Sequence, residues 1–118
     1  MKRYSIKTIK GKLDKLVGDH YRQRRCDYHG GIGCAGRLEW AHIKSRRYLS
    51  TRWQPLNSLT LCSKQHRYFT DNPDEFTLWL DVKFPNRLKA LQKIFNITDT
   101  IHDWQLEELY EHLKETLK

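Results

Sequence analysis

The spacing of hydrophobic residues predicts helices at both ends of the chain. From Ile6 to Tyr21, apolar side chains recur every three or four positions with lysines between them, which predicts a basic amphipathic helix over about residues 6–24. Residues 71–75 (DNPDE) combine polar capping residues, a proline and acidic side chains, and this combination favours a helix start. Three further helices are expected: from about residue 73 toward Pro85, over about 88–95, and over about 104–117 with Asp103 as its cap.

The middle of the chain has shorter segments bounded by turn-forming residues. Four glycines within residues 26–36 predict tight turns. Residues 37–43 (RLEWAHI) predict a short strand in which positions 38, 40 and 42 share one face and 39, 41 and 43 the other. An arginine-rich connection follows, then a second short strand over 59–62 and a helical stretch over 64–70. The pattern as a whole predicts an α+β fold.

The composition limits the chain to one small domain. With 118 residues, 14.3 kDa, 38% hydrophobic residues and a mean hydropathy of −0.82, its core must be small, and a staple such as a metal ion would help it fold. No apolar run approaches the roughly 18 residues needed to span a bilayer, and the first residues are not followed by a signal-type apolar segment. We therefore expect a soluble, cytoplasmic protein without a membrane partner.

Positive charge is concentrated in the N-terminal part of the chain. The formal net charge is +8, but residues 1–70 hold sixteen basic and four acidic side chains, whereas residues 71–118 hold six basic and ten acidic ones. This asymmetry favours a face that binds a polyanion such as nucleic acid, joined to a neutral-to-acidic packing segment. A basic surface that serves only solubility is the alternative.

The three cysteines suggest thiol chemistry rather than disulfides. Cys26, Cys34 and Cys62 form an odd set in a chain with no secretory signal, which argues against a disulfide framework. Metal ligation and free buried thiols both remain open at this point. Within the same part of the chain stand His42, Asn57 and His66, each a weak signal alone but informative as a group.

Three runs that contain these residues resemble the HNH endonucleases, in particular small bacteriophage HNH proteins. They are LEWAHIKSRR (38–47), RWQPLNSLTLC (52–62) and HRYFTDNP (66–73), and the resemblance covers roughly residues 20–85. It implies a ββα-metal hairpin–helix core at about 25–72, flanked by the N-terminal helix at about 6–24 and a C-terminal helical scaffold at about 73–118, all in a single domain over residues 1–118.

The resemblance implies hydrolysis of DNA phosphodiester bonds with one divalent cation. In that family, His42 corresponds to the general base, Asn57 to the residue that holds the loop and helps position the base or the metal, and His66 to a ligand of the catalytic ion. Imidazole can accept a proton from water at neutral pH, and Mg²⁺, Mn²⁺ or Ni²⁺ suits an imidazole-plus-oxygen site. Four arginines are expected to contact DNA phosphates: Arg46, Arg47, Arg52 and Arg67.

Two positions depart from the family pattern. Ala41 stands where many HNH nucleases have an aspartate or histidine that binds the metal, and Thr70 stands where a further histidine is common. A catalytically degenerate, zinc-stabilised DNA-binding module is therefore one alternative, and an accessory factor that binds a phage packaging or recombination protein is another. The expected setting is the cytoplasm of a bacterial host cell. Nicking is the expected reaction, and the oligomeric state stays open.

The family often carries two Cys-x-x-Cys knuckles that bind a structural zinc ion. Here the second cysteine of each knuckle is replaced, by His29 and by Gln65. Cys34 lies close enough in sequence to supply a missing thiolate. The resulting expectation is a structural zinc site with four ligands, Cys26, His29, Cys34 and Cys62.

Overall fold

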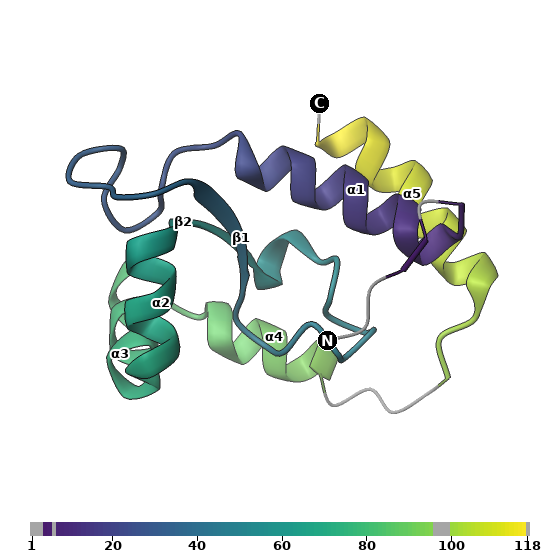
Figure 1. The fold of residues 1–118 in the computed structure, drawn as a ribbon. Coiled ribbons are helices and arrows are strands. Elements are labelled where there is room, and N and C mark those ends of the chain that lie inside the picture. The colour runs from purple at the N-terminus through teal and green to yellow at the C-terminus, as the bar shows by residue number, and fades with distance from the viewer. Residues whose placement is uncertain (1–3, 6, 96–99, 118) are drawn as a thin grey trace.

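The computed structural model describes residues 4–5, 7–95 and 100–117. It contains five α-helices and a two-stranded antiparallel hairpin, which confirms the predicted α+β class (Figure 1). Residue 6, where the predicted N-terminal helix begins, lies outside the described residues. The elements are α1 (Ile9–Arg22), β1 (Leu38–His42), a 3₁₀ turn η1 (Pro55–Asn57), β2 (Ser58–Cys62), α2 (Ser63–Asp71), α3 (Pro73–Lys83), α4 (Arg87–Phe95) and α5 (Asp103–Thr116).

The first and last helices begin at identifiable caps. The Thr8 hydroxyl accepts a hydrogen bond from the Gly11 N–H at 3.0 Å, so α1 begins at Ile9. Asp103 was predicted to cap the last helix, and this prediction is wrong. His102 is the N-cap, and its backbone N–H donates to Gln105 Oε1 at 2.7 Å, so Asp103 lies in the first helical turn.

The hairpin has the predicted alternation of faces. In its register Trp40 lies opposite Thr60, and His42 lies opposite Ser58. The rings of Trp40 and His42 are 4.3 Å apart, centroid to centroid, as expected of two side chains on one face of a strand. Ala41 points to the other face and is 2% exposed.

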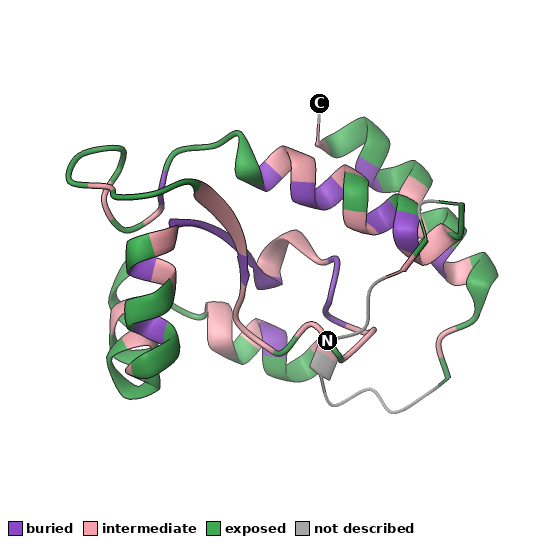
Figure 2. Cartoon of the chain, in the orientation of Figure 1, coloured by how far each residue is buried: buried purple, intermediate pink, exposed green. Residues whose placement is uncertain are grey.

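Two hydrophobic clusters lie on opposite sides of this hairpin (Figure 2). The cluster toward α2 and α3 contains Cys26, Ala41, Leu59, Leu61, Cys62, Phe69 and Leu80. The cluster toward α1 and α5 contains Leu13, Val17, Tyr21, Trp53, Leu106 and Leu113. The hairpin is thus covered on both faces, and it fixes the position of residues on either side of it.

The glycine-rich segment between α1 and β1 packs on the first turn of α2. The Ser63 N–H donates to the Arg37 carbonyl at 2.8 Å, and the Lys64 N–H donates to the Ala35 carbonyl at 3.2 Å. Gly36 has a φ of +81°, and a Cβ at this position would overlap the Ser63 hydroxyl. Glycine is therefore required there both by the backbone conformation and by the close approach of α2.

The molecule is elongated, with extents of 41 × 27 × 27 Å. Helices α1 and α5 lie side by side at one end, and α2 and α3 lie at the other (Figure 1). Among the described residues, no helix is both long and apolar enough to cross a membrane.

Candidate active site and cysteine cluster

Asn57 holds the connection between the two strands. Its Oδ1 accepts the Lys44 N–H at 2.7 Å, and its Nδ2 donates to the carbonyls of Lys44 and Thr51, both at 3.1 Å. The side chain is fully buried. This geometry agrees with the loop-holding role predicted for Asn57. It does not agree with the predicted role as a metal ligand, because the amide oxygen and nitrogen already bind backbone groups away from solvent.

Arg52 is anchored to helix α1 instead of pointing to solvent. Its guanidinium makes a two-pronged contact with Asp14, with Nε–Oδ1 and Nη2–Oδ2 distances of 2.9 and 2.8 Å, and its Nη1 donates to the Arg46 carbonyl at 2.9 Å. Arg52 is only 2% exposed. The prediction that Arg52 contacts DNA phosphates is therefore wrong, because the guanidinium is sealed inside the fold by its carboxylate partner.

The ring of His42 is oriented by the backbone of Arg52. Its Nε2 lies 3.0 Å from the Arg52 carbonyl oxygen. A carbonyl only accepts, so this nitrogen carries the proton, and in the neutral ring Nδ1 keeps its lone pair. Burial lowers the pKa of His42 from 6.5 to about 4, against the opposing effect of the hydrogen bond to Arg52. At neutral pH the ring is therefore an uncharged proton acceptor with a fixed orientation.

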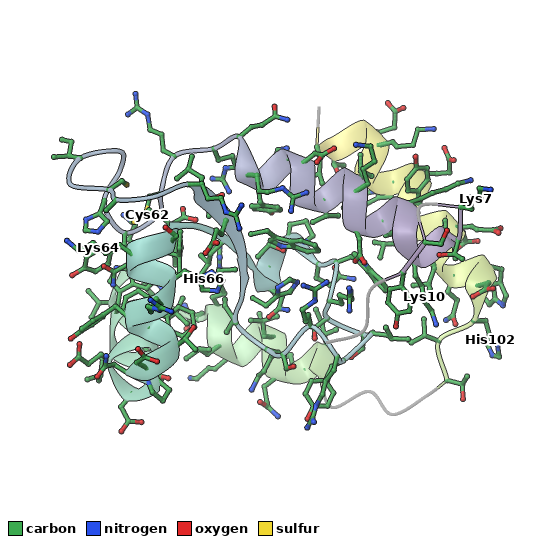
Figure 3. All side chains as sticks on the ribbon, viewed as in Figure 1. Lys7, Lys10, Cys62, Lys64, His66 and His102 are labelled. Atoms are coloured by element: carbon green, nitrogen blue, oxygen red, sulfur yellow. The ribbon has the colours of Figure 1, made fainter. Side chains whose placement is uncertain are left out.

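His66 pairs with a carboxylate that the sequence did not single out. Its Nδ1 lies 2.9 Å from Glu39 Oε1, and both side chains are about one-third exposed. The other carboxylate oxygen faces Arg37, with 3.6 Å between Nε and Oε2. Glu39 and His66 line one open cavity of about 560 Å³, together with Lys64, Arg67 and Asp71. Figure 3 shows His66 and Lys64 on α2, on opposite sides of the helix in this view.

A smaller cavity connects the two predicted histidines. His42 and His66 both line a space of about 190 Å³ between β1 and α2. Ala41 also lines it, at the position where the HNH pattern has a metal-binding side chain. Glu39 and His66 thus share the larger cavity, and His42 and His66 line the smaller one. The His42 ring itself lies on the Trp40 face of β1, and Asn57 is buried in the adjacent loop.

A sequence signal for Glu39 was available. Residues 39 and 41 share a face of β1, so a long side chain at 39 reaches the same side of the hairpin as the small Ala41. Glu39 is also one of only four acidic residues in the basic part of the chain, residues 1–70. An isolated acidic side chain on the same strand face as Ala41 is therefore a candidate metal ligand from the sequence alone.

The remaining predicted arginines have different environments. Arg67 is exposed and lines the larger cavity. Arg47 is exposed, and its guanidinium lies over the Tyr48 ring at 4.8 Å and donates to the Tyr48 hydroxyl at 2.7 Å. Arg46 is half-buried. The lysine side of α1 is remote from this region, because Lys7 and Lys10 lie at the opposite end of the molecule from His66 (Figure 3).

The three cysteines come together next to the first turn of α2. The sulfur atoms of Cys26, Cys34 and Cys62 all lie within 4.8 Å of one another. Cys26 Sγ accepts the Cys62 N–H at 3.3 Å. Burial and the neighbouring thiols raise the pKa of Cys34 to about 11. Burial also acts to raise the pKa of Cys62. Hydrogen bonds from the backbone N–H groups of Ala35 and Gln65, together with those from the two neighbouring thiols, outweigh it, so the pKa of Cys62 is lowered.

The cluster fits a thiolate-binding ion such as zinc. Tetrahedral zinc with bonds of about 2.3 Å to sulfur requires sulfur atoms about 3.8 Å apart, a spacing that the observed cluster can accommodate. His29 was predicted as the fourth ligand, but the group of candidate ligand atoms in the described residues does not include it. The prediction that His29 completes the site is therefore wrong for this conformation. Its Nε2 is buried without a hydrogen-bond partner among the described residues.

Comparison with known family models, with curated proteins and with solved structures found no match to this chain. The function of the protein is therefore inferred from the geometry of the site.

Proposed function

We propose that the protein is a metal-dependent DNA endonuclease of the HNH type that hydrolyses phosphodiester bonds and nicks its substrate. The observation that carries this proposal is a neutral imidazole held in a fixed orientation on β1, in a hairpin whose other face carries a carboxylate–imidazole pair. The His42 ring lies on the Trp40 face of β1, and the Glu39–His66 pair lies on the Ala41 face, toward α2. His42 and His66 both contribute to the lining of the smaller cavity. A base and a separate set of cation ligands are the two elements that hydrolysis of a phosphodiester requires.

His42 is suited to take a proton from water. The Nε2–H is committed to the Arg52 carbonyl, so the proton is accepted at Nδ1. The imidazolium that forms is stabilised by the same carbonyl oxygen. The charges of Arg46 and Arg52 disfavour it, and the carboxylate of Asp14 favours it to a smaller extent. A negatively charged phosphodiester beside the ring raises the pKa of His42 toward neutrality, which makes it a stronger base when substrate is bound.

Glu39 and His66 form a donor set that fits a hard divalent cation. Two neighbouring ligands of an octahedral ion with bonds of about 2.1 Å are about 3.0 Å apart, close to the 2.9 Å between Oε1 and Nδ1. When bound, Mg²⁺ or Mn²⁺ stabilises the negative charge that develops on the phosphate oxygens. In this proposal Glu39 takes over the role that Ala41 cannot perform.

The cavity that holds Glu39 and His66 also has groups that attract phosphate. Lys64 and Arg67 line it and are exposed. Arg47 and Arg46, on the loop after β1, are the further phosphate contacts of the proposal. Binding that relies on such contacts is dominated by the DNA backbone and weakens steeply with salt.

The cysteine cluster has a structural role in this proposal. A zinc ion held by Cys26, Cys34 and Cys62 would tie the glycine-rich segment to the start of α2. His66 lies three residues after the first residue of this helix, so the ion would keep the turn that carries His66 from fraying. In a domain with so small a core, such a link stabilises the platform that presents His66.

Conversion of supercoiled plasmid tests the proposal. Wild type, His42→Ala and His112→Ala are compared in Mg²⁺, in Mn²⁺ and in EDTA. His112 is an exposed histidine on α5 and serves as the matched control. We expect metal-dependent nicking by wild type and His112→Ala, and none by His42→Ala, with DNA binding retained in all three. If wild type binds DNA but does not cut it in the presence of either ion, the protein is a DNA-binding module and the proposal is wrong.

A further inference from the structure

A second cavity lies on the other side of the hairpin and shares no residue with the candidate active site. It has a volume of about 300 Å³ and lies where the end of α1, the η1 turn and the start of α4 meet. Two arginines, two aromatic rings and two further polar residues dominate its lining: Arg24, Arg87, Tyr21, Phe84, Asp27 and Ser58. Neither arginine has a role in the fold or function described above.

Arg87 is a half-buried cation with few partners. Its guanidinium lies 4.0 Å from the centre of the Phe84 ring, and its Nη1 approaches the Ser58 carbonyl at 3.5 Å, the limit of a hydrogen bond. A guanidinium has five N–H donors, so most of its donor capacity is unused by these contacts. Burial lowers the pKa of Arg87, which reflects the cost of holding this charge away from water.

Arg24 adds a second positive charge to the same space. It lies over the Tyr21 ring at 5.3 Å and is otherwise exposed. Its charge repels that of Arg87 and lowers the pKa of Arg87, by less than Asp27 and Tyr21 raise it. The aromatic rings support both guanidinium groups without neutralising them.

Asp27 is the acidic residue of the cavity, and it offsets part of this positive charge, because it raises the pKa of Arg87. Asp27 Oδ2 accepts the Thr60 N–H at 2.7 Å, which ties the carboxylate to β2. Among the described residues, no carboxylate lies within the 4.0 Å ion-pair distance of Arg24 or Arg87. The cavity therefore keeps a net positive charge and an excess of hydrogen-bond donors.

We propose that this cavity is a phosphate-binding site in which Arg24 and Arg87 hold one phosphate group. Guanidinium groups donate to pairs of phosphate oxygens, and two of them match an anion with several oxygens better than a single carboxylate. On the proposed nuclease function, the occupant is a DNA backbone phosphate at a distance from the cleaved bond. Such a contact positions the duplex and carries no sequence information.

The first test uses inorganic phosphate and the full-length protein without divalent cations. Wild type, Arg24→Gln and Arg25→Gln are titrated with phosphate against chloride of matched ionic strength, and backbone amide NMR shifts are followed. Arg25 is the exposed neighbour that does not line the cavity, so it controls for the change in net charge. We expect shifts around Tyr21 and Arg87 in wild type and Arg25→Gln, and an affinity about tenfold lower in Arg24→Gln.

A second variant tests the other arginine of the cavity with a conservative substitution. Arg87→Lys keeps the charge and the contact with Phe84 but loses the forked donors, and it is expected to weaken phosphate binding by a similar factor. Equal phosphate affinity in wild type, Arg24→Gln and Arg87→Lys, or no phosphate binding by wild type at millimolar concentration, overturns the proposal.

The DNA arm separates the two sources of phosphate. The slope of log affinity against log salt is measured for a short duplex without metal. It is expected to fall by about one for Arg24→Gln and to stay unchanged for Arg25→Gln. An unchanged slope in Arg24→Gln, together with intact binding of inorganic phosphate, overturns the DNA assignment and leaves a site for a free phosphate compound. Neither result depends on cleavage, so failure of the nuclease proposal is seen separately.

Discussion

The ring of His42 donates a hydrogen bond from Nε2 to the backbone carbonyl of Arg52 at 3.0 Å. Arg52 is itself fixed by two contacts with Asp14 on α1. The orientation of the proposed base is therefore set by a helix outside the region that resembles the HNH motif. Asn57 acts in parallel, because it binds the backbone of the same loop at Lys44 and Thr51.

Removing Asp14 is expected to destabilise the fold strongly. Asp14→Ala leaves the buried guanidinium of Arg52 without its partner and removes the acceptor of the Trp53 indole N–H. We expect a loss of about 3–5 kcal/mol in the free energy of unfolding, measured by urea denaturation. Asp19→Ala is the control, because Asp19 lies on the same helix but makes exposed ion pairs worth under about 1 kcal/mol. Equal effects of the two changes would contradict this reading of Arg52.

The low pKa of His42 predicts a specific loss of stability in acid. The ring titrates near pH 4 in the folded protein and near 6.5 in the unfolded chain. The unfolded chain therefore binds more protons between these values, and stability rises with pH from 4 to 6.5 and falls as the pH drops through that window. The contribution across the whole window is about 3 kcal/mol.

A variant that cannot titrate isolates this contribution. His42→Asn is expected to lose less stability than wild type between pH 6.5 and pH 4.5, and His112→Asn is expected to follow wild type. Urea denaturation at a series of pH values measures the difference. If wild type and His42→Asn show the same pH dependence, the ring is not buried in its neutral form.

Glu39 is predicted to be a metal ligand of the proposed active site. Glu39→Gln removes the charge with little change in size, and it should lower the affinity for Mn²⁺ by about 10–100-fold while the fold is kept. Isothermal titration with Mn²⁺, and cleavage as a function of Mn²⁺ concentration, measure the effect. Glu107→Gln, on the exposed part of α5, is the control. Unchanged Mn²⁺ affinity in Glu39→Gln would mean that the carboxylate only orients His66.

The cysteine cluster is predicted to bind one thiolate-preferring ion per chain. Co²⁺ added to the metal-free protein should give the charge-transfer absorption of cobalt–thiolate bonds, and zinc should displace it. Cys62→Ser should lose this signal and unfold at a lower temperature, because the link between the glycine-rich segment and α2 is lost. Absence of any cobalt–thiolate signal from the reduced wild-type protein would leave three buried thiols as the correct description.

The sequence pattern was enough to predict the helices and the hairpin, because apolar spacing decides which faces are buried. It also singled out His42 and His66, which both line the smaller cavity. It could not distinguish Arg52 from Arg47 and Arg67, because the partner that buries Arg52 lies 38 residues earlier, on α1. Pairing across such a separation depends on how α1 packs against the hairpin, which local pattern does not encode.

The same limit explains the two errors in the metal sites. His29 is near Cys26 and Cys34 in sequence, but the left-handed glycines of its loop determine where its ring goes. Glu39 reaches His66 only because β1 and α2 pack face to face, 27 residues apart in sequence. Spacing identified the residue types that bind metals, and tertiary packing selected which of them meet.

The rate at which His42→Gly nicks supercoiled plasmid, with and without added imidazole, tests the central claim most directly. Removing the base is expected to slow metal-dependent nicking by at least about 100-fold, and free imidazole should restore part of the rate because it replaces the missing proton acceptor. The Mg²⁺ concentration is held fixed, and wild type without imidazole is the reference. Cleavage by His42→Gly at the wild-type rate without imidazole would contradict the account.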